Sequence, residues 1–116
     1  MWNPFDNTLL GENAHDKFGT SVSMAENGLV FTVGAPFNDG GGTDAGSVKV
    51  YEWNGSDWAQ RGVNIYGKLD NEPSGHSVSI SGNGNSIAIG STRVRVYDWD
   101  GSSSYKKEMT WALVIV

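Results

Sequence analysis

The residues with the clearest capacity for chemistry lie in one polar stretch, Ala35–Gly46, which reads APFNDGGGTDAG. Glycine lets a backbone approach an anion closely, but no Gly-Lys-Ser/Thr ending and no helix start follow, so a phosphate loop is not expected. Calcium would use Asp39 and Asp44, with Asn38 and Thr43 as further oxygens, although these four do not alternate as EF-hand ligands do. We expect a solvated connection that binds a ligand without a cofactor, and calcium at Asp39 and Asp44 is the alternative.

Aromatic side chains are the second candidate for ligand binding, because flat rings offer surfaces on which sugars stack. Trp53 and Trp99 occupy equal positions in two copies of a repeat, and so do Tyr51 and Tyr97. Packing between repeats would require the same recurrence, and we expect that role for these four. Trp58 lies in an edge-like outer strand, where partial exposure is expected, and is therefore the aromatic candidate for ligand binding.

Catalytic constellations are not found in the sequence. His15 and His76 are offset by 61 residues, so they are not a repeated pair, and no serine has the context of a nucleophile elbow. The chain contains no cysteine, which excludes disulfides, zinc–thiolate sites and thiol nucleophiles. We therefore predict no catalytic residues and no enzymatic activity.

These candidates sit on an internal repeat, which is the main organising feature of the chain. Residues 2–34 match residues 58–90 at a constant offset of 56, with nine identities that include Gly19-x-Ser-Val-Ser23 and Asn27-Gly28. Residues 48–56 then match residues 94–102 at an offset of 46, with six identities in nine. The ten-residue difference falls in the 35–46 stretch, so the second copy lacks this loop.

Each copy has the pattern of four short strands. Serine alternates with apolar residues over 20–25 and 76–81, and a second strand is expected over 29–33 and 86–89. Asn-Gly pairs between them predict type I′ turns. The third strand places Val48 and Val50 on one face and Lys49, Tyr51 and Trp53 on the other, and Val94–Trp99 repeats this pattern. Fourth strands are expected over 58–67 and 105–115.

Large groups on both faces of the third strand predict that each sheet packs against sheets on both sides. Four-stranded antiparallel meanders repeated at this period describe the blades of a β-propeller. We therefore predict an all-β fold with about two blades: residues 15–68 form the first and residues 69–116 a second, shorter one. Residues 1–14 match the fourth strand and are predicted to be the outer strand of a preceding or ring-closing blade.

Three short motifs resemble those of one propeller family. Phe18-Gly19, Gly34-Ala35-Pro36 and Gly46-Ser-Val-x-Val-Tyr51 are similar to the FG-GAP repeat, the blade unit of integrin α-subunit heads and of many bacterial and algal surface proteins. The second copy departs from this pattern, with Ser74-Gly75 and Gly90-Ser91-Thr92. The calcium loop of many such blades does not carry over, because Glu26-Asn27-Gly28 offers one carboxylate where calcium takes six to eight oxygens.

The net charge, the length of the apolar runs and the number of blades limit what the chain can bind or assemble with. A net charge of −5 without a basic cluster argues against nucleic-acid binding, and the longest apolar run, Trp111–Val116, is too short to span a membrane. No signal peptide is recognisable at the start of the chain. Closed propellers have about four to eight blades, so we expect either copies of this chain that complete a ring or further blades of a longer chain.

The resemblance implies a non-enzymatic binding module for recognition or adhesion, with a glycan or protein ligand, at a cell surface or outside the cell. A structural or scaffolding repeat without a ligand is the alternative. A fragment or accessory propeller of a larger protein or enzyme also fits the sequence.

Overall fold

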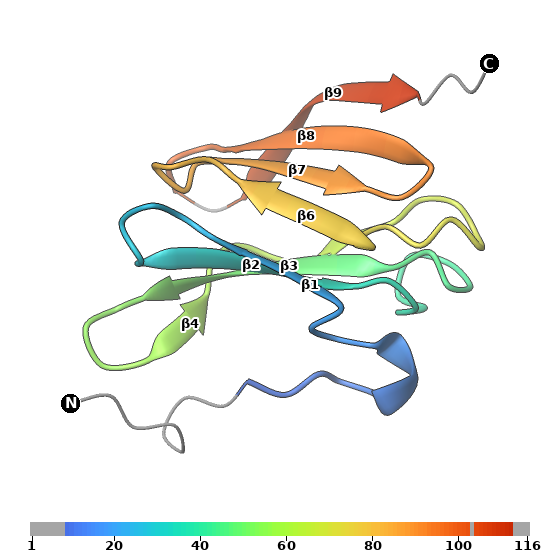
Figure 1. Ribbon diagram of the computed structural model, residues 1–116, viewed down its shortest axis with the longest axis horizontal. Coiled ribbons are helices and arrows are strands. Elements are labelled where there is room, and N and C mark those ends of the chain that lie inside the picture. The colour runs from blue at the N-terminus through green and yellow to red at the C-terminus, as the bar shows by residue number, and fades with distance from the viewer. Residues whose placement is uncertain (1–8, 103, 113–116) are drawn as a thin grey trace.

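The protein is built from two antiparallel β-sheets stacked face to face (Figure 1). The computed structural model describes residues 9–102 and 104–112, and the side chains of residues 9–102 and 104–106. In this part of the chain the helical structure is a single 3₁₀ turn, η1 (Ala14–Asp16), and no helix is long and apolar enough to cross a bilayer. The predicted all-β class is confirmed.

The first sheet has the order β1-β2-β3-β4, with β5 beside the start of β3. Its strands are β1 (Ser21–Met24), β2 (Val30–Ala35), β3 (Ser47–Trp53), β4 (Trp58–Gln60) and β5 (Ile65–Tyr66). The predicted fourth strand over 58–67 is wrong in one respect. It is interrupted between Gln60 and Ile65, so that two short strands pair with different ends of β3, although the backbone N–H of Arg61 still donates to the carbonyl of Val50.

The second sheet repeats this arrangement without the interruption. Its order is β6-β7-β8-β9, formed by β6 (Ser77–Ile80), β7 (Ser86–Gly90), β8 (Arg93–Trp99) and β9 (Tyr105–Ala112). The strands expected over 76–81 and 86–89 are therefore confirmed. The strand expected over 105–115 is confirmed to residue 112, and its remainder lies outside the described residues.

The tight turns between the first two strands of each sheet differ from the prediction. A type I′ turn needs positive φ at both central residues, but only the glycines adopt it, with φ of 73° at Gly28 and 78° at Gly84. Asn27 instead accepts a hydrogen bond from the backbone N–H of Leu29, at 2.9 Å, and Asn83 accepts one from Asn85. The asparagine side chains thus cap longer turns, and the prediction of type I′ geometry is wrong.

The core lies between the two sheets. The first sheet contributes Val30, Val48 and Val50, and the second contributes Ile87, Ile89 and Tyr97, all of which are buried. The sheets come closest where β6 crosses β1 and β2, as Figure 1 shows. The prediction that Tyr97 and Trp99 pack between the repeats is confirmed, because Tyr97 belongs to this core and Trp99 packs against it.

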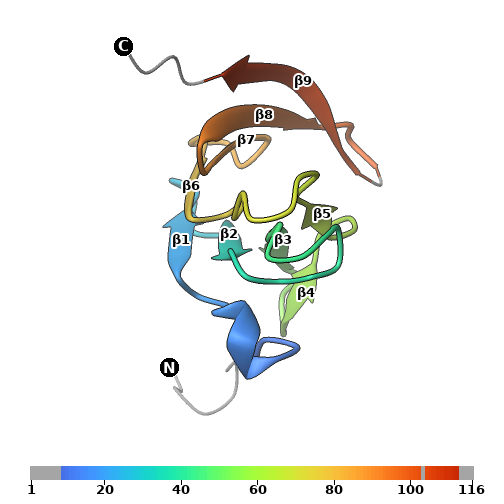
Figure 2. The ribbon, with the colours of Figure 1, turned by 90° about the vertical axis from the view of Figure 1, so that its right-hand side faces the viewer.

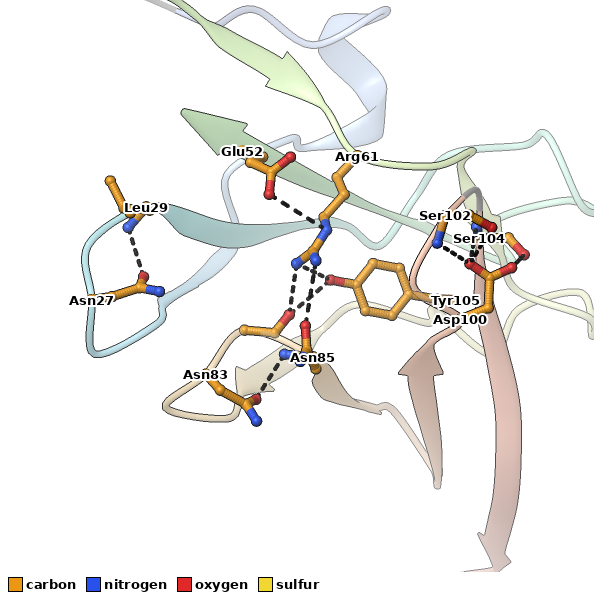
Figure 3. A network of polar contacts seen from close by, with 11 residues as sticks. Asn27, Leu29, Glu52, Arg61, Asn83, Asn85, Asp100, Ser102, Ser104 and Tyr105 are labelled. Atoms are coloured by element: carbon orange, nitrogen blue, oxygen red, sulfur yellow. Dashed lines mark hydrogen bonds and ion pairs between the residues drawn. The ribbon is translucent and has the colours of Figure 1, made fainter. Parts of the chain in front are cut away.

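Arg61 links the first sheet to the turn between β6 and β7 of the second sheet (Figure 3). It follows β4 at the interruption, and its guanidinium carbon lies 4.4 Å from the centre of the Trp99 ring. Figure 3 shows the guanidinium between Glu52 and Asn85. Its Nη1 donates to the backbone carbonyl of Gly84 at 3.1 Å, and the Tyr105 hydroxyl donates to the same oxygen at 2.9 Å. Burial raises the pKa of Tyr105, although the nearby Arg61 opposes that shift.

The N-terminal segment lies on the far side of the first sheet. Residues 9–13 form no strand, and residues 1–8 are outside the described part, so the outer strand predicted over residues 1–14 stays a prediction. Glu12 reaches Lys49 on β3, with 2.8 Å between Oε2 and Nζ. This hydrogen bond and the positive charge lower the pKa of Glu12. Burial of Lys49 acts to lower its pKa, but Glu12 together with the nearby Tyr51 and Tyr66 acts to raise it, and the net shift is upward.

Candidate functional site

Three polar segments meet at one end of the molecule, the end that faces the viewer in Figure 2. They are the loop of residues 36–46 between β2 and β3, the turn around η1, and the connection of residues 67–76 between the two sheets. We call them together the loop end. Antiparallel pairing places them there, because β2 and β5 end at the same end of the molecule at which β3 and β6 begin.

Asn38 holds the loop to η1. Its side chain is buried, its Nδ2 donates to Asp16 Oδ2 at 2.8 Å, and its Oδ1 accepts from the backbone N–H of Gly40 at 2.8 Å. The backbone carbonyl of Asn38 also accepts from the N–H of Gly46 at 3.0 Å. Both ends of the amide are therefore engaged within the protein, and Asn38 positions the loop; ligand binding by Asn38 stays a prediction.

The two loop aspartates lie together. Asp39 Oδ1 accepts a hydrogen bond from the backbone N–H of Asp44 at 2.8 Å, and Asp44 takes the left-handed conformation, with φ of 47°. Asp44 Oδ1 is 3.1 Å from Nε2 of the exposed His15. Asp39 is exposed and Asp44 is half-buried, so the structure brings both sequence candidates to the surface of the loop end.

Thr43 ties the loop to the second repeat. Its backbone N–H donates to Asp70 Oδ1 at 2.9 Å, and its carbonyl accepts from the N–H of Asn71 at 2.8 Å. Ala45, two residues on, is fully buried and bonds to Ser74 through its carbonyl at 2.9 Å. The expectation of a solvated connection therefore holds only for the exposed tip, and the interpretation of the loop's ends as solvated is wrong.

The glycines of the loop permit close packing. A Cβ at Gly41 would lie 2.1 Å from the carbonyl oxygen of Gly67, and one at Gly46 would lie 2.0 Å from that of Ser74. A Cβ at Gly40 would meet the Tyr66 ring at 2.2 Å. The sequence shows why glycine suits a loop, but only the structure shows that these glycines admit neighbouring backbone and a ring.

The metal hypothesis receives no added ligands from the fold. Among the described side chains, those of residues 9–102 and 104–106, no three acidic or histidine groups gather in a way that could hold a metal ion. Asp39 and Asp44 alone do not fit calcium, which takes six to eight oxygens, and one oxygen of Asp39 already accepts a backbone N–H. Calcium at these two residues stays a prediction.

Trp58 does not join the loop residues. It pairs with Trp53 across β3 and β4, at the opposite end of the first sheet, and its ring centre is 5.4 Å from that of Trp53 and 4.7 Å from that of Phe31. All three rings are half-buried, so Trp58 is partly exposed, as expected. The structure therefore separates the acidic loop from the aromatic candidate.

A groove beside the loop was missed by the sequence analysis. It has a volume of about 400 Å³, and its lining includes Gly41 of the loop, Tyr66 and Lys68 from the first repeat, and Tyr97 and Tyr105 from the second. Tyr66 keeps 38% of its surface exposed. The equivalent position in the other copy is Leu10, but most aligned positions of the two copies differ, so nothing in the sequence marked this groove.

Comparison with known protein families gave a match. A family model described as the FG-GAP repeat matches residues 11–51, which run from the N-terminal segment through β1, β2 and the loop to the middle of β3. A comparison with curated proteins gave no significant match. The matched residues include Phe18-Gly19 and Gly34-Ala35-Pro36, the same elements on which the sequence resemblance rests. Residues 11–51 therefore match an FG-GAP repeat, and the resemblance drawn from the sequence is confirmed over this part of the chain.

Proposed function

We propose that the chain is a non-enzymatic recognition or adhesion module of the β-propeller type, which acts at a cell surface or outside the cell and binds a glycan or protein at its loop end. One observation carries this proposal. The exposed tip of the 36–46 loop is fixed by hydrogen bonds from η1 and from the connection of residues 67–76. A polar loop held rigid on a β scaffold loses little entropy when it binds, which favours recognition.

The stacking of the sheets supports the propeller part of the proposal. Both sheets are antiparallel meanders of the same order, and the second lies on the first with its first strand, β6, against β1 and β2. The contact brings one face of the first sheet against the opposite face of the second. Successive blades of a propeller pack in this manner around a common axis.

The chemistry of the loop end favours a ligand rich in hydroxyl groups. Asp39 and Asp44 present carboxylate oxygens, which accept hydrogen bonds, and Asp70 lies across the loop from them. The ring of Tyr66 rests against the loop glycines and remains partly exposed beside the groove. Carboxylates next to an exposed ring suit a sugar, whose hydroxyls donate and whose C–H face stacks.

A structural repeat without a ligand is the second candidate function, and one observation favours it. Much of the polar capacity of the loop is used within the protein, as the contacts of Asn38 and Thr43 show. An accessory propeller of a larger protein or enzyme also fits. A ligand that depends on the exposed residues would separate recognition from these alternatives.

A glycan-array screen of the labelled protein, with and without calcium, tests the proposal. We expect binding to at least one glycan class and a loss of about tenfold or more in Asp39→Asn, which keeps an acceptor but removes the charge, and in Tyr66→Ala. Asp57→Asn is the matched control, because Asp57 is an exposed acid in the β3–β4 hairpin at the opposite end. No binding on the array under either condition would favour the scaffolding role.

A further inference from the structure

The contact between the two sheets uses different faces of equivalent strands. The first sheet contributes the face that carries Ser21, Ser23, Gly34, Val48 and Val50, as the cross-strand pairs Ser21–Gly34 and Gly34–Val48 show. The second sheet contributes the other face, which carries Val78, Ile80, Ile87, Ile89 and Tyr97. The interface within the chain is therefore formed by a face of serine, glycine and valine against a face of large apolar residues.

Each partner of this contact is present a second time, on an outer side of the molecule. We call the outer side of the first sheet the aromatic face: Val22, Met24, Phe31, Tyr51, Trp53 and Trp58. We call the outer side of the second sheet the serine face: Ser77, Ser79, Ala88, Gly90, Val94 and Val96. By the repeat offsets, the aromatic face corresponds to the large apolar face of the second sheet, and the serine face to the inner face of the first.

Two glycines show that these outer faces are shaped for the same contact. Within the chain, a Cβ on Gly34 would lie 2.1 Å from the carbonyl oxygen of Gly75, so the two backbones approach as only glycine allows. The equivalent of Gly34 is Gly90, whose Cβ would meet only Ser77 of its own sheet. The equivalent of Gly75 is Gly19, which has the same φ of 91° but no atom within 4 Å of its Cβ position.

A serine accompanies each glycine. Ser21 Oγ donates to the carbonyl of Gly75 at 2.7 Å, and Ser23 Oγ accepts from the backbone N–H of Ile80 at 3.2 Å, so two hydrogen bonds cross between the sheets. Ser77 and Ser79 hold the same positions on the serine face and are exposed. Their matching partners, Gly19 and Met24, lie on the first strand of the first sheet or directly before it.

The exposure of apolar residues on the two outer faces also indicates that these faces are suited to a further contact. Val22 and Met24 keep 65% and 55% of their surface exposed, whereas the equivalent Val78 and Ile80 pack against the core. Val94 and Val96 are half-buried, but the equivalent Val48 and Val50 are buried, at 0% and 2%. Tyr51 on the aromatic face is itself buried, but Val22, Met24, Val94 and Val96 are each more exposed than their equivalents in the internal contact.

We infer that the aromatic face binds the serine face of a second copy of this chain. Gly90 and Ser77 of one copy would meet Gly19 of the next, and Ser79 would meet Met24, which repeats the internal contact between copies. The two faces are different, so the contact is head-to-tail and continues from copy to copy, either into a closed ring or into an open filament. The inference extends the blade stacking of the proposed function and does not depend on a ligand.

Sedimentation velocity over a range of protein concentrations tests this inference. We expect the mass of the full chain to rise above the 12.5 kDa monomer as concentration increases. Gly90→Ala should weaken association by about tenfold or more. Its Cβ meets only Ser77 Oγ within the chain, which can rotate away, but it blocks the backbone of the next copy. Met24→Lys should have a similar effect from the opposite face, because it places a charge in the contact.

Gly82→Ala is the matched control, because Gly82 is exposed and its Cβ would touch only the side chain of Glu26. It should associate as the unchanged chain does, and thermal melts of all variants would show whether each is folded. A mass of 12.5 kDa at every concentration, or association that Gly90→Ala and Met24→Lys leave intact, would overturn the inference. Glycan binding by such a monomer would still support the proposed function, so the two fail separately.

Discussion

Replacement of Arg61 by alanine should loosen the contact between the two sheets. The side chain is largely buried and stacks on Trp99, and it donates to the Gly84 carbonyl and to Asn85 Oδ1 at 3.1 and 3.3 Å. Its Nε lies 3.8 Å from Glu52 Oε2, a charge pair too long for a hydrogen bond. Figure 3 shows Glu52 of the first sheet and Asn85 and Tyr105 of the second repeat around this guanidinium.

The magnitude follows from these contacts. A shielded cation–π pair contributes about 2 kcal/mol, and each hydrogen bond from a charged donor contributes about 1.5 kcal/mol. Release of the side chain regains about 2 kcal/mol of conformational entropy. The exposed Glu52 and the carbonyl of Gly84, which keeps its bond from Tyr105, add little further cost. We therefore expect Arg61→Ala to lower the free energy of unfolding by about 3 kcal/mol.

Urea denaturation followed by tryptophan fluorescence measures this loss. Arg61→Lys should cost about half as much, because an ammonium keeps the charge but not the forked geometry. Lys68→Ala, which removes an exposed cation, should change stability by less than about 0.5 kcal/mol. A loss below about 1 kcal/mol for Arg61→Ala, or strict additivity with Trp99→Leu in a double-mutant cycle, would refute the reasoning.

Three further changes probe other contacts. Gly34→Ala should destabilise by about 3 kcal/mol or more in thermal melts, because its Cβ would lie 2.1 Å from a backbone oxygen of the second sheet; a neutral result would contradict that packing. Asn38→Ala leaves the buried carboxylate of Asp16 without its amide donor and should cost about 2 kcal/mol, with faster hydrogen exchange at the loop tip. The hydrogen bond from Arg93 lowers the pKa of Glu72. The stabilisation that this pair gives the folded state is therefore complete above the usual pKa of a glutamate and is lost as the pH falls through the lowered pKa. Glu72→Gln should therefore lose roughly 0.5–1 kcal/mol at pH 7 and flatten the acid limb of urea midpoints, and an unchanged limb would count against the pair.

Much of the fold could be predicted from the sequence because the repeat constrains it twice. The alternation in Ser21–Met24 and Ser77–Ile80 assigned strands and faces, and the structure has both. The third strand was also placed correctly, since Val50 and Tyr51 point to opposite, packed faces. These features depend on local periodicity, which sequence displays directly.

The features that sequence could not show depend on neighbours distant along the chain. Nothing local says that the Arg61 side chain stacks on the Trp99 ring, because that ring belongs to the other sheet. The loop glycines suggested a ligand site, yet Gly41 and Gly46 are needed by the backbone of residues 67–74. Asn38 offers a ligand oxygen in the sequence, and only the fold shows that this oxygen accepts the backbone N–H of Gly40.

Directed cross-linking tests the central claim, that the contact between the two sheets is one that a second copy repeats. The chain has no cysteine, so Ser79→Cys and Met24→Cys can be introduced singly, at the outer equivalents of the Ser23–Ile80 contact. On mild oxidation, the account predicts a covalent dimer in a mixture of the two variants and very little in either variant alone. No dimer in the mixture, or equal dimer in one variant alone, would contradict it.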